Sequence, residues 1–145
     1  MTSCLWATLG GRGGAVVPDM DKRFPTPKGA QVAAQRSIDK SKEKPPSQRG
    51  MTPWGRKYRR APLARGEWFT LRQYRRFARY FSRHLEDKQG QTWDDYGKGR
   101  QAWDGWGDDV MARHVIRTIR KHDKQWFTKW AESPRNRRLM RHLGL

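Results

Sequence analysis

The stretch that decides the fold runs from Tyr80 to Asp109 and reads YFSRHLEDKQGQTWDDYGKGRQAWDGWGDD. It contains three of the eight tryptophans and seven of the fourteen acidic residues of a chain whose formal net charge is +18. The neighbouring segments are basic: residues 49–85 carry a net charge of +10 and residues 110–145 a net charge of +8, against −4 for residues 86–109. The sequence therefore contains an aromatic, acidic segment flanked by basic segments.

The charge of the chain indicates the kind of partner that it meets. A formal net charge of +18 on 145 residues makes a compact chain repel itself, so we expect a polyanion as its neighbour. Nucleic acid is the usual polyanion, and an anionic membrane surface is the other candidate. No apolar run approaches the length of a membrane span, and the single cysteine, Cys4, has no partner for an internal disulfide.

Length and composition limit the fold. A chain of 145 residues fits one domain with an arm, and a hydrophobic content of 34% is low for a full core. An aromatic content of 12% compensates, because each aromatic side chain buries roughly 150 to 250 Å². The apolar residues recur at helical spacing and no stretch reads as a strand. We therefore expect an all-α fold: a small helical domain with an aromatic core and an extended N-terminal arm.

The N-terminal part of the chain divides into an arm, two helices and a linker. Residues 1–26 are punctuated by glycine and proline and are expected to form an extended or disordered arm. A short amphipathic helix is predicted over residues 28–39, and the basic, proline-containing residues 40–52 are interpreted as a linker. Thr52 is then expected to cap a short basic helix, which Pro62 stops or bends.

The strongest helical pattern begins at Thr70, a good N-cap, and runs to about Glu86. Its apolar residues recur every three or four positions and predict a core-facing side: Leu71, Tyr74, Phe77, Ala78, Phe81 and Leu85. A row of arginines occupies the rest of its surface: Arg72, Arg75, Arg76, Arg79 and Arg83. Solvated helix faces usually mix both signs, whereas no acidic residue lies between Glu67 and Glu86. The row is therefore interpreted as a contact surface.

Further helices are expected after this one. Residues 89–99 are predicted to be a loop anchored by Trp93, and residues 100–106 a helix of about two turns. Asp108 or Asp109 is expected to cap a longer helix, which ends near residue 131 and bends near Asp123. Ser133 and Pro134 then start a final helix. The predicted organisation is an arm (1–26), a helical domain (27–131) and a basic C-terminal helix (132–145).

Seven residues are expected to form the structural core: Phe77, Phe81, His84, Trp93, Trp103, Trp106 and Trp126. Trp103 and Trp106 lie three positions apart, which places them on one side of a helix. Stacking on nucleic-acid bases is the alternative role for this pair, but beside Ala102 a place in the core is favoured. His84 and Asp87 are expected to form a buried hydrogen-bonded pair that fixes the end of the long helix.

One part of this stretch resembles a known module. The residues that carry the resemblance are His84, Asp87, Lys88, Gly90, Gly99, Ala102, Trp103, Trp106, Gly107 and then Asp108 or Asp109. Together with the motifs that precede them, these residues make the segment of about residues 25–109 similar to a small helical module encoded in many tailed-bacteriophage genomes. The chain differs from that module at Gly105, where a bulkier apolar residue is usual, and at Asp108, which replaces a second glycine. The resemblance implies a bacteriophage origin and a neighbourhood among virion genes, and it implies no catalytic activity.

The acidic residues of the central stretch have two interpretations. They can hold Mg²⁺ for phosphodiester cleavage, or Asp94 and Asp108 can cap helices while the others pair with the arginine row. The chain lacks the carboxylate spacings that nucleases place on a strand, so the second interpretation is favoured. The four histidines are scattered and Cys4 has no second cysteine beside it, so no zinc site, other metal or cofactor is expected.

The candidate contacts for nucleic acid or another polyanion come from three basic groups: the helix after Thr52, the arginine row and the C-terminal helix. They are Arg56, Lys57, Arg59, Arg60, Arg72, Arg75, Arg76, Arg79, Arg83, Arg135, Arg137, Arg138 and Arg141. Because these side chains suit phosphates and no base-reading motif is present, we expect binding that is independent of sequence and falls with salt.

These features predict a non-enzymatic structural protein of a phage virion, of the capsid-associated, cement or connector type. Its expected partners are other virion or assembly proteins together with packaged DNA or acidic neighbouring subunits, without a membrane. The expected location is the virion, after synthesis in the host cytoplasm. An RNA-binding, ribosome-associated protein, including an organellar one, is the alternative, and a small metal-dependent nuclease is the third possibility.

Overall fold

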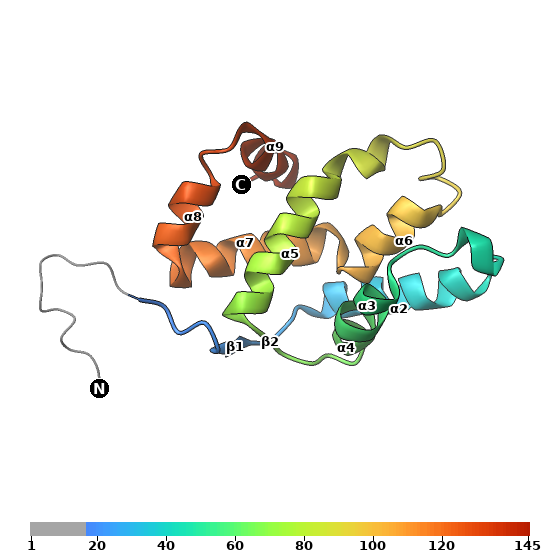
Figure 1. The fold of residues 1–145 in the computed structure, drawn as a ribbon, viewed down its shortest axis with the longest axis horizontal. Coiled ribbons are helices and arrows are strands. Elements are labelled where there is room, and N and C mark those ends of the chain that lie inside the picture. Colours follow the sequence, from blue (N-terminus) through green and yellow to red (C-terminus); the bar gives the residue numbers. More distant parts are fainter. Residues whose placement is uncertain (1–16) are drawn as a thin grey trace, which may run out of the picture.

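The computed structural model describes residues 17–145, so residues 1–16 of the predicted arm lie outside the described part. The architecture is all-α, as predicted, with one small two-stranded sheet among the described residues. Helix α5 (Leu71–His84) crosses the middle of the molecule and packs on α7 (Asp108–His122), as Figure 1 shows. Helices α8 (Lys124–Trp130) and α9 (Pro134–Leu143) lie on one side of this pair, and α2 (Lys28–Lys42) and α6 (Lys98–Gly105) on the other.

Helix α2 packs against α6, α4 (Ala61–Ala64) and α7 through small side chains. Ala30, Ala33 and Ala34 are fully or almost fully buried, which lets the neighbouring helices approach closely. The helix runs to Lys42, beyond the predicted end, and is followed by a 3₁₀ turn, η1 (Pro46–Gln48). Ser41 and Gly50 are buried, so the predicted linker is partly helical and forms part of the packed domain.

The basic helix predicted after Thr52 forms as three continuous segments: α3 (Pro53–Gly55), the π-helix η2 (Arg56–Arg60) and α4. The Thr52 hydroxyl accepts a hydrogen bond from the amide of Gly55 at 3.0 Å, which confirms the predicted cap. Pro62 does not stop the helix. Proline has no amide hydrogen to donate to the carbonyl four residues earlier, and that carbonyl, of Tyr58, accepts from Nη1 of Arg59 at 2.8 Å instead.

Two short strands were not expected from the sequence. Strand β1 (Arg23–Phe24) pairs in antiparallel fashion with β2 (Phe69–Thr70), with Arg23 opposite Thr70 and Phe24 opposite Phe69. Phe24 is buried against the ring of Tyr74, so the end of the predicted arm is fixed to the domain. Strand β2 leads directly into α5, where the Thr70 and Gln73 side chains form a reciprocal capping box.

The predicted aromatic core is present. Phe77, Phe81 and Trp103 are fully buried, and Trp106 is 9% exposed. Phe77 meets Trp106 edge to face with ring centroids 5.2 Å apart, and Phe81 meets Trp103 in the same way at 4.9 Å. Tyr80 stacks on Trp106 at 4.4 Å. These rings join α5 to α6 and to the turn that follows α6, which confirms a core role for the Trp103 and Trp106 pair.

Three of the predicted core residues lie at its rim instead. His84 stacks on Tyr80 and its Nδ1 lies 3.2 Å from an Asp87 oxygen, but both side chains are more than one third exposed. The predicted pair therefore exists without being buried, because the chain turns outward into the 3₁₀ segment η3 (Leu85–Gln89) at this point. Trp93 and Trp126 are half-buried, each with a cationic side chain over its ring.

The two differences from the phage module have local explanations. Gly107 and Asp108 both have positive φ, at 107° and 61°, so the turn after Trp106 needs two left-handed residues in succession. Aspartate tolerates this conformation better than most side chains, which lets Asp108 stand where a second glycine is usual. A Cβ at Gly105 would overlap the Sδ atom of Met51 and lie 3.2 Å from Cδ of Arg60. Met51 therefore fills the space that a side chain at position 105 would need.

The C-terminal helices belong to the same packed body. The helix expected to bend near Asp123 ends there, and α8 begins at Lys124. Helix α9 packs against α5 and α7 through the buried Leu139 and Leu143. The Ser82 hydroxyl of α5 donates to the amide oxygen of Asn136, which adds a polar link between α5 and α9.

The contact of His114 with Pro25, the residue after strand β1, is expected to make the free energy of unfolding depend on pH. The Nε2 atom of His114 lies 2.9 Å from the Tyr74 hydroxyl and 3.0 Å from the Pro25 carbonyl, and burial lowers the pKa of His114. The unfolded chain then binds a proton more readily than the folded one, so this contribution is present above about pH 6.5 and is lost as the pH falls below that value. Urea unfolding at pH 7.5 and 5.5 should show the loss.

The variant His114→Gln is the matched comparison for this effect. Glutamine keeps an amide donor but does not titrate in this range, so the variant should lose less stability between the two pH values than the wild type. An unchanged difference would assign the pH effect to other groups. His122 is one such group, because burial and the charges of Lys22 and Lys121 lower its pKa.

Candidate functional site

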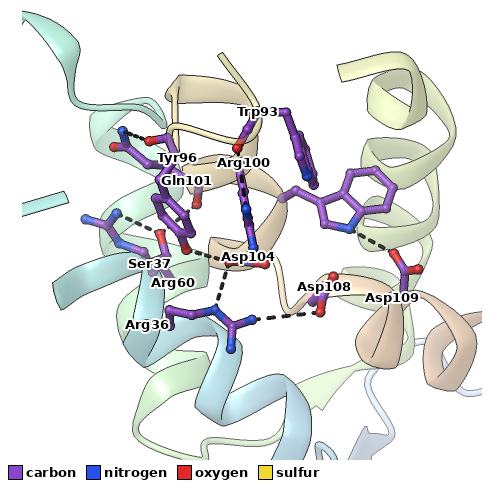
Figure 2. Close-up of polar contacts among 11 residues, drawn as sticks. Arg36, Ser37, Arg60, Trp93, Tyr96, Arg100, Gln101, Asp104, Asp108 and Asp109 are labelled. Atoms are coloured by element: carbon purple, nitrogen blue, oxygen red, sulfur yellow. Dashed lines mark hydrogen bonds and ion pairs between the residues drawn. The ribbon is translucent and has the colours of Figure 1, made fainter. Parts of the chain in front are cut away.

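The acidic residues of the central stretch act as internal partners. Asp104 is 3% exposed and accepts hydrogen bonds from Nε of Arg36 at 3.1 Å and from the Tyr96 hydroxyl. Asp109 accepts from the Trp103 indole at 3.0 Å and lies 3.1 Å from Nζ of Lys88. Figure 2 shows the contacts of Asp104 with Arg36 and Tyr96 and the hydrogen bond of the indole to Asp109, between α2, α6 and the start of α7. The carboxylates are thus used to hold the helices together.

The expected roles of these carboxylates were partly wrong. Helices α6 and α7 begin after Gly97 and Gly107, so neither Asp94 nor Asp108 is the N-cap residue. Four acids of the stretch, Asp87, Asp104, Asp108 and Asp109, pair with Arg36, Lys88 and two histidines, and not with the arginine row. Within residues 17–145, no three Asp, Glu, His or Cys side chains group closely enough to hold a metal ion.

The arginine row of α5 divides into one inward and four outward side chains. Arg75 is the inward one: its Nη2 lies 2.6 Å from the buried Asp123, and its guanidinium lies over the Trp126 ring. The exposed four follow one another at spacings of four, three and four residues, which places them in a single stripe along the helix: Arg72, Arg76, Arg79 and Arg83. We call this set the arginine stripe.

The charge of the arginine stripe is largely unneutralised within the described residues. No carboxylate there lies within 4.0 Å of the guanidinium groups of Arg76, Arg79 or Arg83. Arg72 lies 3.6 Å from Asp21, but both side chains are mostly exposed, so water and salt screen this pair. The stripe runs over twelve residues of helix, from Arg72 to Arg83, which is about 16 Å at about 1.5 Å per step.

A groove of about 740 Å³ borders the stripe on the side of residues 49–55. Its walls come from this segment, from α5 and from the two ends of α6, and they contain five Lys or Arg side chains, His84 and no acid. The lining residues are Arg49, Gly50, Met51, Thr52, Trp54, Gly55, Arg76, Arg79, Tyr80, Arg83, His84, Lys98, Ala102 and Trp106. This groove is therefore basic, with aromatic rings in its walls.

A second groove of about 680 Å³ lies between the end of α5, η3 and α9. Its basic residues are Arg83, Lys88, Arg135, Arg138, Arg141 and His142, and Glu86 is its one acidic lining residue. Arg83 lines both grooves, so they meet across α5. We call the two grooves together the basic track.

The structure brings some of the predicted contact residues together at the basic track and buries others inside the fold. Six of them line the basic track: Arg76, Arg79, Arg83, Arg135, Arg138 and Arg141. Arg59 is 4% exposed and Arg60 is 8% exposed. Arg60 donates to the hydroxyls of Ser37 and Ser41, and Arg75 is paired with Asp123, so Arg60 and Arg75 are structural and not part of the surface contact.

The remaining predicted residues lie outside the two grooves. Arg56 donates to the Gly50 carbonyl, while Lys57, Arg72 and Arg137 are exposed. Sequence reasoning missed Arg49 and Lys98, which come from the predicted linker and the predicted loop. A net basic charge was the only signal at these positions, and it does not show which loop residues face one another.

Comparison with known proteins gives no match: no family model, no curated protein and no solved structure is similar to this chain. In the described part of the chain, no helix has both the length and the apolar character that crossing a bilayer requires. The site is therefore interpreted from its own geometry.

Proposed function

We propose that this protein is a non-enzymatic structural protein of a phage particle that binds nucleic acid through the basic track. One observation carries the proposal: the arginine stripe lies between two grooves and has almost no carboxylate to neutralise it. Asp104 and Asp109 pair with Arg36 and Lys88 inside the fold, so they do not neutralise the positive charge of the stripe, which is available to an external anion.

The side chains of the track suit phosphate groups. Arginine presents several donors in a planar arrangement that matches phosphate oxygens, and helix-borne arginines at regular spacing can follow a charged backbone. Contacts of this kind position a nucleic acid without reading its sequence. We therefore expect binding to many sequences with similar affinity.

The assignment to a phage particle rests on the resemblance of residues 25–109 to the tailed-phage module. The residues that carry the resemblance include Trp103 and Trp106 in the core and Asp109 in the internal ion pairs. They support a scaffold that holds α5, α6 and α7 together. The basic surfaces built on this scaffold supply the contact to packaged DNA, and virion proteins remain the expected neighbours.

A salt titration tests the proposal. Affinity for a duplex of mixed sequence should fall steeply with salt, with a slope of log K against log salt of about −4, the value for four to five neutralised phosphates. Arg83→Glu should weaken binding at a fixed salt concentration by about tenfold, or about 1.4 kcal/mol, because Arg83 lines both grooves. Fluorescence anisotropy of a labelled duplex measures both quantities.

Arg117→Glu is the matched control for this experiment. Arg117 is an exposed helix arginine on α7 that lines neither groove, and its replacement changes the net charge by the same amount. Its effect should be much smaller than that of Arg83→Glu. Equal losses would mean that overall charge, and not the track, attracts the duplex. No binding even at low salt would refute a role in contacting nucleic acid.

A further inference from the structure

A third hollow, of about 260 Å³, opens beside the basic track. Its lining residues are Trp54, Tyr58, Arg59, Arg72, Gln73 and Arg76. Trp54 and Arg76 also line the first groove, so the hollow continues the track toward the start of α5. Three arginines and two aromatic rings meet here, without an acidic residue in the lining.

Arg59 is the unusual member of this set. Its side chain is almost wholly buried, and within residues 17–145 no carboxylate pairs with it. Its Nη1 donates to the Tyr58 carbonyl at 2.8 Å, while its buried Nε has no acceptor. Burial and the neighbouring Arg76 lower the pKa of Arg59 to about 10, so the group is still charged at neutral pH. A buried charge with an unused donor is costly, and an anion in the hollow would relieve that cost.

Aromatic rings surround the same guanidinium. Its central carbon lies 4.6 Å from the centroid of the Trp54 ring and 5.6 Å from that of Trp106. These contacts hold the cation in place beside the hollow without neutralising it, because a ring carries no net charge. Arg59 is therefore positioned as a fixed positive group.

Trp54 and Tyr58 form an exposed aromatic pair at the rim of the hollow. They lie one helical turn apart with ring centroids separated by 5.7 Å, and are 41% and 47% exposed. The exposed Arg76 guanidinium lies over the Trp54 ring at 4.9 Å, from where it can turn toward a phosphate and uncover the ring. Exposed rings next to arginines are the combination with which single-strand binders hold bases and phosphates.

We propose that this hollow binds one nucleotide unit of a single strand, with the phosphate on Arg59, Arg72 and Arg76 and the unpaired base on Trp54 and Tyr58. The proposal rests on the proposed function and adds to it a preference for single-stranded over double-stranded nucleic acid. Bases of a duplex are already stacked on one another, and unstacking them costs free energy. Duplex binding therefore uses the basic track alone, whereas a single strand gains the aromatic contact as well.

The test compares two single-stranded probes of equal length and charge, oligo(dT) and an abasic phosphodiester oligomer. The wild type should bind oligo(dT) about tenfold more tightly than the abasic probe, since a stacked base contributes on the order of 1–3 kcal/mol. Trp54→Leu should remove most of this difference. Tyr58→Leu, at a residue that lines the hollow but neither groove of the basic track, should reduce the difference and leave duplex affinity within about twofold of the wild type. Trp68→Leu is the matched control, because Trp68 is 54% exposed and does not line the hollow.

A separate variant tests the phosphate contact of the proposed site. Arg72→Gln removes an exposed lining charge and should weaken both single-stranded probes by a similar factor, with the oligo(dT) preference kept. Equal wild-type affinity for oligo(dT) and the abasic probe would overturn the base contact. Intact oligo(dT) preference in Trp54→Leu would do the same and would assign the exposed rings to a protein contact. Duplex binding that persists in either case leaves the proposed function standing.

Discussion

Replacement of Gln101 by leucine is expected to lower the free energy of unfolding by about 3–5 kcal/mol, because two to three buried polar groups lose their partners at about 1–3 kcal/mol each. The Gln101 side chain is fully buried, and its amide makes four hydrogen bonds. Its Oε1 accepts from the Ser41 hydroxyl at 2.9 Å and from the Gly50 amide at 2.6 Å. Its Nε2 donates to the carbonyls of Gln48 at 3.1 Å and Tyr96 at 3.0 Å.

This amide joins three parts of the chain that are distant in sequence: the end of α2, the segment before α3 and the turn before α6. Leucine has a similar size, so the loss measures hydrogen bonding and not an empty space. Urea unfolding followed by circular dichroism gives the difference, and Gln125→Leu, at an exposed glutamine of α8, is the control. A stability within about 1 kcal/mol of the wild type would show that water replaces these bonds.

Trp103→Ala is expected to have an effect of similar or larger size, about 3–5 kcal/mol. Trp103 is fully buried between α5 and α6, where its ring meets Phe81 edge to face and its indole donates to Asp109. A natural domain has about 5–15 kcal/mol of stability, so this loss removes a large share of it and should clearly lower the midpoint temperature of unfolding. Thermal unfolding monitored by circular dichroism checks this result.

Two further variants show which lost interaction makes Trp103→Ala unstable. Trp103→Phe keeps much of the volume but loses the hydrogen bond to Asp109, so it should fall between the wild type and Trp103→Ala. Trp68→Ala removes a tryptophan that is 54% exposed and should change stability little. If Trp103→Ala stays folded but loses nucleic-acid binding, the ring contacts bases and is not a core residue.

The sequence predicts the local features of this fold well. The capping box at Thr70, the apolar side of α5 and the cap at Thr52 depend on residues a few positions apart, which a pattern reveals directly. The aromatic core was also predicted, because Phe77, Phe81, Trp103 and Trp106 are too large and apolar to remain in water.

The long-range features could not be predicted in this way. Arg36 and Asp104 are 68 positions apart, and nothing in either segment marks them as partners. Periodicity identified the arginine row but could not show that Arg75 turns toward Asp123 while its neighbours face outward. The burial of Arg59 is contrary to the usual behaviour of charged side chains, so composition alone places it on the surface.

The internal use of the acidic residues has a consequence for how copies of this protein associate. Because Asp104 and Asp109 are occupied within each molecule, two copies that face each other through their basic tracks bring mostly like charges together, with Glu86 as the one acidic lining residue. Such a pair repels itself until a negatively charged chain lies between the copies. Like charges therefore disfavour self-association through this face, and under the proposed function a nucleic acid between two copies would remove that repulsion.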